Sequence, residues 1–153
     1  MALLSTKLTE VLGVDHPVLL APMCGMAMSE LAGHVARAGG VGLIGIGSSR
    51  IFAPDRVRRE YGAASAIAKE GKGAIGFGFL QTFLDGNEND PSFVAAVEFR
   101  PRCIWLSFGS AESTEKLAAY VRSSSPETKV IVQVFTPRRP STLPGWPTLW
   151  WCR

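Results

Sequence analysis

The sequence of 153 residues contains no run of about 18 or more apolar residues, so no transmembrane helix is expected. Its amino terminus lacks the basic segment followed by an apolar segment that is typical of a signal peptide. The three cysteines, Cys24, Cys103 and Cys152, are odd in number and widely spaced, which fits neither a disulfide framework nor a CxxC metal site. These absences predict an intracellular, cytoplasmic protein with reduced thiols.

A broad basic surface is also lacking. The net charge is +3, but residues 137–153 contain three arginines and no acidic residue, which leaves 13 basic and 13 acidic residues elsewhere. A neutral body is a poor footprint for a nucleic-acid-binding protein. The pair Arg138–Arg139 is too short for a polybasic membrane patch. We therefore expect neither a nucleic acid nor a membrane as a partner.

Short apolar runs alternate with amphipathic segments along most of the chain, and this alternation predicts βα repeats. The predicted strands are residues 17–21, 41–47, 74–80, 102–108 and 129–135, and the predicted helices are 29–38, the segment from Pro54, 90–97 and 112–122. Repeated βα steps imply an α/β fold with a parallel sheet. Two architectures remain open, a doubly wound sheet and a (β/α)₈ barrel, of which a complete barrel takes at least about 200 residues.

Several residues suggest how the predicted helices begin and pack. Ser29 is a candidate N-cap of the first helix, and Asp90 followed by proline is a candidate N-cap of the third. Two apolar stripes at helical spacing are expected to face the core: Leu31, Val35 and Ala38, and then Val57, Tyr61, Ala64 and Ala68.

Residues 40–45 match the pattern G-x-G-x-x-G, which in dinucleotide-binding proteins follows a strand and opens a helix. Here a predicted helix precedes the glycines and a predicted strand follows them. The backbone amides would not lie at a helix N-terminus, where a pyrophosphate binds. We interpret the motif as a helix end followed by a closely packed strand.

The segment PVLLAPMCGMAMSELAGHVARAGGVGLIG resembles the amino-terminal strand, loop, helix and strand of the nitronate monooxygenase family, formerly called 2-nitropropane dioxygenases. The matching pieces occur in order as Ala21-Pro22-Met23, Glu30-Leu31-Ala32, Ala38-Gly39-Gly40 and Gly42. Further on, GFGFLQTFLD, WLSFG and KVIVQV resemble strands of the fungal branch, so the resemblance covers residues 8–135. It implies the N-terminal part of a (β/α)₈ TIM barrel over residues 1–136.

The resemblance also implies FMN as cofactor, and an alkyl nitronate or nitroalkane and dioxygen as substrates, with a carbonyl compound and nitrite as products. Ligands of such barrels bind at the carboxyl ends of the strands. The residues expected to form a flavin ledge are Ala21, Pro22, Met23, Gly78 and Gln133. The family commonly has an asparagine at the position aligned with Gly78, so one side-chain contact is missing.

Several of these residues also have simpler interpretations. Met23 and Met26 can fill a core as well as contact a ligand. Gln133 can be a hydrogen-bonded buried amide as well as a flavin contact. Cys24 is expected to be a small apolar filler, because no acid–base partner is visible. His16 and His34 are expected at the surface, and neither a Ser–His–Asp set nor a metal site is predicted.

The family's catalytic histidine and its phosphate-binding loops lie beyond the matching segment, so no catalytic residue is predicted. Residues 137–153 form an aberrant tail with four prolines, which forbid a helix, and three tryptophans. One hypothesis is a reading-frame shift or retained intron near Thr136. The alternative is a genuine segment that covers the open edge of a half barrel.

Three functions remain open. The first is an FMN-dependent nitronate monooxygenase. The second is a catalytically inactive barrel fragment that self-associates through exposed sheet edges. The third is another FMN barrel oxidoreductase, resembling an enoyl reductase or IMP dehydrogenase. The segments WLSFG and QTFLD favour the first family over the third.

Overall fold

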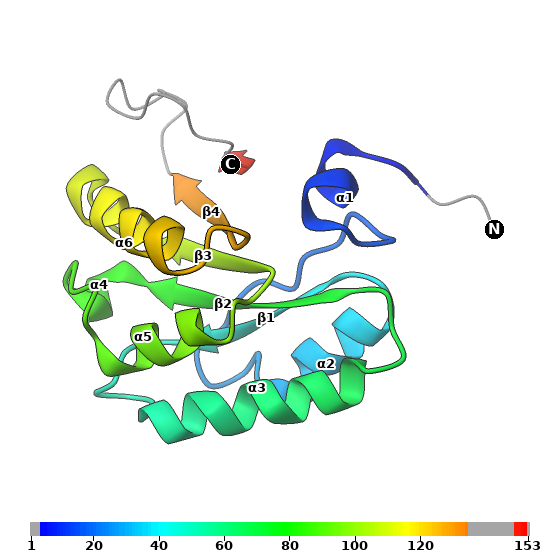
Figure 1. The fold of residues 1–153 in the computed structure, drawn as a ribbon, viewed down its shortest axis with the longest axis horizontal. Helices are drawn as coiled ribbons and strands as arrows, with labels where there is room; N and C mark the ends of the chain where they lie inside the picture. Colours follow the sequence, from blue (N-terminus) through cyan, green and yellow to red (C-terminus); the bar gives the residue numbers. More distant parts are fainter. Residues whose placement is uncertain (1–3, 135–148, 153) are drawn as a thin grey trace.

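The computed structural model describes residues 4–134 and 149–152 of the chain. Helices and strands alternate along it (Figure 1). The elements are α1 (Lys7–Leu12), α2 (Ser29–Arg37), β1 (Val41–Ile46), α3 (Pro54–Ala68), β2 (Ala74–Leu80), α4 (Gln81–Leu84), α5 (Pro91–Glu98), β3 (Cys103–Ser107), α6 (Ala111–Ser124), β4 (Lys129–Val134) and β5 (Leu149–Cys152).

The five strands form one parallel sheet in the order β1-β2-β3-β4-β5. The order follows the sequence without reversal, whereas a doubly wound sheet reverses its strand order at a switch point. Sequential parallel βα units are the arrangement of the N-terminal part of a (β/α)₈ barrel. The predicted fold class is therefore confirmed, and the doubly wound alternative does not apply to the described residues.

The predicted strand at residues 17–21 is wrong in extent. Only a single parallel bridge forms, between Leu19 and Val41. It is held by the Leu20 N–H on the Val41 carbonyl (2.9 Å) and the Val41 N–H on the Val18 carbonyl (2.9 Å). The chain then leaves the edge of β1, because residues 22 and 23 lie across the sheet rather than beside it.

The outer face of the sheet carries the larger core. Side chains of β1 to β4 that point to this face pack against α2, α3, α5 and α6, and Phe77, Phe79 and Phe93 lie at the centre of the cluster. The rings of Phe79 and Phe93 meet edge to face at 5.1 Å between centroids, a favourable arrangement. The expected stripe of α3 is confirmed, since Val57 and Ala64 are buried in this core.

Helix α2 uses another face than the sequence suggested. Its buried residues are Ala32, Gly33 and Ala36, whereas Leu31 is 43% exposed. Gly33 lies against α3, where a Cβ atom would be 2.8 Å from the Cβ of Ile67. Small residues thus set the contact because the two helices approach too closely for leucine. Ser29 is the first helical residue rather than the N-cap.

Helix α1 covers the inner face of the sheet and was not predicted from the sequence. Leu12 of α1 and the following Val14 pack with Val41, Leu43, Cys103 and Ile131 in a second, smaller cluster. The start of α1 is fixed by Thr6 and Thr9, whose side chains and backbone amides form a reciprocal capping box. In Figure 1, α1 lies on the side of the sheet opposite to α2 and α3.

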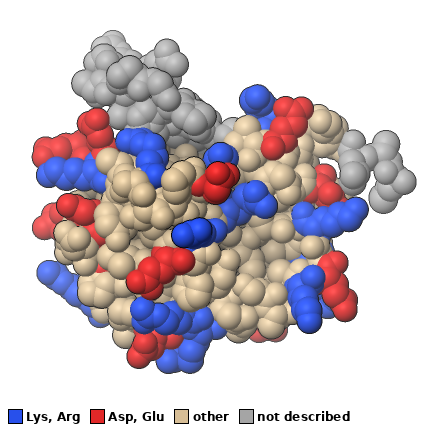
Figure 2. Space-filling model, in the orientation of Figure 1, with Lys and Arg blue, Asp and Glu red and all other residues tan. Residues whose placement is uncertain are grey.

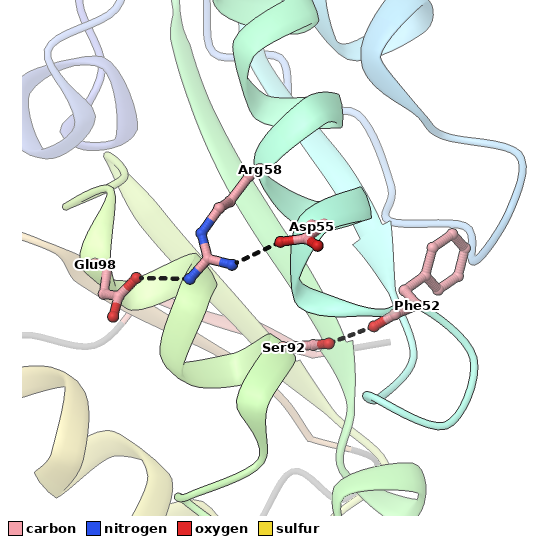
Figure 3. A network of polar contacts seen from close by, with 5 residues as sticks. All are labelled: Phe52, Asp55, Arg58, Ser92 and Glu98. Carbon is pink, nitrogen blue, oxygen red and sulfur yellow. Dashed lines mark hydrogen bonds and ion pairs between the residues drawn. The ribbon is translucent and has the colours of Figure 1, made fainter.

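Helices α3 and α5 are joined by polar contacts at their surface (Figure 3). Arg58 of α3 pairs with Asp55 in the same helix (3.2 Å) and with Glu98 of α5 (3.4 Å). Beneath this network, the buried hydroxyl of Ser92 donates to the Phe52 carbonyl in the loop before α3. These contacts fix where α5 begins relative to the loop that follows β1.

Strand β5 pairs with β4 in parallel, with Ile131 opposite Leu149 and Gln133 opposite Trp151. The remainder of the predicted tail, including its four prolines, lies outside the described residues. The pairing places a strand along the edge of β4, the edge that one of the two interpretations of the tail expected to be covered.

The charged residues are mixed on the visible surface. On the face drawn in Figure 2, lysines and arginines alternate with aspartates and glutamates. None of the helices within residues 4–134 has both the length and the apolar character to span a membrane.

Asp90 provides a test of the link between α5 and the loop after β1. Its buried carboxylate accepts hydrogen bonds from the backbone N–H groups of Ser92, Phe93 and Ser49 and from the Ser49 hydroxyl (2.6 Å). We expect Asp90→Ala to lower the free energy of unfolding by about 2 kcal/mol, because several donors lose their acceptor. Urea denaturation measures the change.

The matched control is Asp55→Ala, which removes a carboxylate that is 84% exposed in its ion pair with Arg58. We expect a change of at most about 0.5 kcal/mol there, because exposed ion pairs contribute little. Equal losses in the two variants would show that Asp90 does not anchor α5.

Candidate functional site

A cavity of about 550 Å³ runs along the inner face of the sheet. It extends to the carboxyl ends of β2, β3 and β4, where Leu80, Ser107 and Gln133 lie. The described residues that line it are Leu8, Pro17, Val18, Leu19, Ala21, Pro22, Leu80, Trp105, Ser107, Phe108, Ile131 and Gln133. Its volume is within the usual range for small-molecule sites, and most of its lining is apolar.

Two glycines of the sheet hold the chain segment that forms one wall of this cavity. Gly45 and Gly78 are partners in the parallel pairing of β1 and β2. A Cβ atom on Gly78 would lie 2.0 Å from the Cβ of Pro22, and one on Gly45 would lie 2.5 Å from the Met23 carbonyl carbon. The segment therefore crosses the sheet directly above these glycines, which explains why the predicted first strand is cut short.

The structure brings together three of the five residues predicted as a flavin ledge and leaves two outside the cavity. Ala21, Pro22 and Gln133 line the cavity together. Met23 and Gly78 do not line it, because Gly78 is buried beneath Pro22 and the Met23 backbone lies over Gly45. Gly78 thus acts through the place it leaves for Pro22 rather than through a ligand contact of its own.

The loop after Pro22 is open to solvent. Met23 and Met26 are 43% and 76% exposed, so neither fills the core. Cys24 is also exposed, which corrects the expectation that it is an apolar filler. Partial burial raises the pKa of its thiol, and the charge of Arg56 opposes the rise. Gly25 adopts a φ of 77°, a backbone conformation that favours glycine.

Polar atoms enter the cavity at its carboxyl end. Gln133 is half-buried, and its amide makes no hydrogen bond with another of the described residues. Ser107 is buried, and its hydroxyl donates to the Phe79 carbonyl of β2 (3.3 Å). An amide and a hydroxyl at one end of an apolar cavity are able to orient a ligand that has one polar edge.

The amino-terminal end of the inner face is dry. Cys103 is fully buried among the residues that α1 covers, and burial raises the pKa of its thiol to about 12, although Arg102 opposes the rise. A thiol in such surroundings is inert. The chemistry of this face is therefore confined to its carboxyl end.

A second, polar cleft of about 360 Å³ adjoins the cavity. Its floor is the buried Gln81, whose amide donates to Thr114 (2.9 Å) and accepts from Ser113 (2.9 Å). Its rim includes Glu112 and Lys116 of α6, an exposed ion pair (3.0 Å) that lowers the pKa of the glutamate and raises that of the lysine. Phe108 is among the lining residues of both the cleft and the cavity.

The sequence analysis did not select Leu80, Trp105, Ser107 and Phe108 as site residues, although the structure places all four in the cavity wall. Alternation along the predicted strand at 102–108 puts Trp105 and Ser107 on one face, so the strand pattern contained the signal. What was missing was the orientation, because both faces of the strand are buried.

The histidines are peripheral, as predicted. His16 and His34 are both exposed, and neither lines the cavity. Among the described residues, no three His, Cys, Asp or Glu side chains converge in a way that would hold a metal ion.

Two curated relatives are similar to part of the chain. A probable nitronate monooxygenase of Staphylococcus saprophyticus is 42% identical over 57 residues, which are 37% of this chain and 15% of that protein. A nitronate monooxygenase of Paraburkholderia phytofirmans is 40% identical over 53 residues, 35% of this chain and 14% of that protein. No protein-family model matches the chain. These matches are confined to about a third of the chain. They give weak support to a relationship with the nitronate monooxygenases, and thereby to an oxidoreductase class.

Gly78→Ala tests whether the glycine pair seats Pro22. The added methyl would overlap the proline ring, so we expect the free energy of unfolding to fall by about 1–3 kcal/mol. Gly62→Ala is the matched control, because its Cβ meets open space on α3. There we expect a gain of about 0.5–1 kcal/mol, since alanine favours a helix more than glycine does.

Chemical denaturation of both variants measures the two changes. A Gly78→Ala variant as stable as the parent would mean that Pro22 does not rest on this glycine.

Proposed function

We propose that this chain is a member of the nitronate monooxygenase family whose inner-face cavity binds the flavin ring of FMN. The observation that carries the proposal is the meeting of Ala21, Pro22 and Gln133 in one cavity at the carboxyl ends of the strands. The partial likeness to two proteins named nitronate monooxygenase supports it. The fungal-like segments WLSFG and KVIVQV support that branch in particular.

The cavity suits the ring of a flavin better than its phosphate. A flat aromatic ring needs apolar walls, here including Pro22, Trp105 and Ile131, and a few polar groups at one edge. Neither lysine nor arginine is among the described residues that line the cavity. The described lining of the cavity therefore suits the ring and lacks a charged group for the phosphate.

The residues present would bind and orient the ligand. Among the described residues the amide of Gln133 has no hydrogen-bond partner, so its donor and its acceptor can both meet the polar edge of the ring. Pro22 and Ala21 would exclude water from one wall, and Ser107 would offer its hydroxyl oxygen as an acceptor. Bound FMN would supply the redox chemistry by which an alkyl nitronate and dioxygen give a carbonyl compound and nitrite.

Purified protein tests the activity directly. We expect yellow protein after incubation with FMN and dialysis, and nitrite on addition of propyl-nitronate in air. Protein that stays colourless and forms no nitrite would refute the proposed function for this chain.

Gln133→Leu tests the orienting amide. We expect the variant to bind FMN about three- to tenfold more weakly, because leucine has a similar size but offers no hydrogen bond. Quenching of FMN fluorescence during titration gives the affinity. Asn89→Leu is the control, since this amide is exposed and lies outside the cavity. Equal affinities of the parent and the Gln133 variant would exclude a role of the amide in flavin binding.

A second candidate function is an interaction module that self-associates. Within the described residues, both edges of the β1–β4 block have a neighbour, because β5 pairs with β4 and Leu19 bridges to Val41. The open surface is instead the cavity mouth, which is the part of the cavity lining around Val18. This residue is 56% exposed. This observation favours association through the inner face rather than through the edges.

Val18→Asp tests this alternative. If two copies associate through the cavity mouth, light scattering shows a dimer for the parent and a monomer for the variant, because a buried unpaired charge is costly. Leu31→Asp, on the exposed side of α2, is the control and keeps the dimer. A parent protein that is monomeric at all concentrations tested would rule out the interaction module.

A further inference from the structure

Phe108 lines two cavities of different character. The apolar cavity of about 550 Å³ and the polar cleft of about 360 Å³ share this one lining residue among those that the structure describes. On one side its neighbours are Leu80 and Ser107, and on the other they are Gln81 and Gly109. Phe108 is 49% exposed.

The backbone of Phe108 is in an unfavourable conformation. Its φ is 58°, in the left-handed region that bulky residues seldom adopt. Residues held in this region persist only where the surrounding structure determines them, and they concentrate at ligand sites. Phe108 directly follows β3, at the carboxyl end of the strand, where ligands of parallel α/β folds bind.

The structure that holds this conformation is the buried Gln81. A Cβ atom on Gly109 would lie 2.0 Å from the Gln81 side-chain oxygen, so the turn after Phe108 is packed directly on that amide. The same oxygen accepts from the hydroxyls of Ser113 (2.9 Å) and Thr114 (3.1 Å) of α6. Because these partners fix Gln81, they also fix the turn and the direction in which the ring leaves it.

We propose that Phe108 determines the size of the alkyl group that the apolar cavity admits beside the flavin ring, by closing the cavity against the polar cleft. The inference rests on the proposed function, because a nitronate joins an anionic head to an alkyl chain and only the chain suits the apolar lining. Short alkyl chains fit in front of the ring, and longer ones are excluded by it. Removal of the ring joins the two cavities and makes room for a longer chain.

Phe108→Gly is the informative variant, because glycine accepts a positive φ and the fold is retained. Isothermal titration calorimetry in the absence of dioxygen compares the binding of ethyl-, butyl- and hexyl-nitronate, with FMN present. We expect the affinity for hexyl-nitronate, relative to ethyl-nitronate, to rise about tenfold or more over the parent. Phe108→Leu, with a smaller apolar side chain, gives an intermediate ratio.

Phe83→Ala is the matched control, because Phe83 lies on the neighbouring α4, is 46% exposed and lines neither cavity. We expect its chain-length ratio to equal that of the parent. An unchanged ratio in both Phe108 variants, an equal change in Phe83→Ala, or no nitronate binding to any protein would each overturn the inference.

Nitrite formation, measured on the same proteins in air, separates this inference from the proposed function. A parent that binds nitronates but forms no nitrite refutes the enzyme activity, while the chain-length ratios still decide the role of Phe108. Thermal melting of each variant shows that the comparison is made between folded proteins.

Discussion

The absence of side chains at two paired positions of the sheet determines the candidate site. Gly45 and Gly78 lie next to each other on β1 and β2, and Pro22 and Met23 occupy the space above them. The Gly45 N–H also donates to the Ala27 carbonyl (2.8 Å), which fastens the loop just before α2 begins. Any larger residue at either glycine would lift the segment that forms one wall of the cavity.

This constraint also separates the two ends of the inner face. Towards the amino ends of the strands, Leu43 and Cys103 pack beneath α1 in a dry cluster. Towards the carboxyl ends, the glycines leave room for Pro22 and Met23. Ser107 and Gln133 bring polar atoms to the cavity there. The packed cluster and the proposed ligand site therefore lie at opposite ends of the same strands, which is the usual division in parallel barrels.

The repeat pattern of the fold was predictable because it depends on local signals. The strand at 74–80 agrees residue by residue, and Asp90 caps α5 as expected. The first strand could not be predicted correctly, because its length is decided by tertiary contact of Pro22 with Gly78 rather than by its own apolar residues. Helix α1 was missed because its cap relies on two threonines rather than on a Ser-x-x-Glu pattern.

The site was predictable only where a residue acts through its own side chain. Gln133 was selected as a polar group near a strand end, and it lines the cavity. Phe108 was not selected, because neither its positive φ nor its place in the lining of two cavities can be predicted from a run of apolar residues. Its conformation depends on Gln81, a residue 27 positions earlier, and on the hydroxyls of α6. Such long-range dependence explains why strand ends, more than strand centres, escape a prediction made from local pattern.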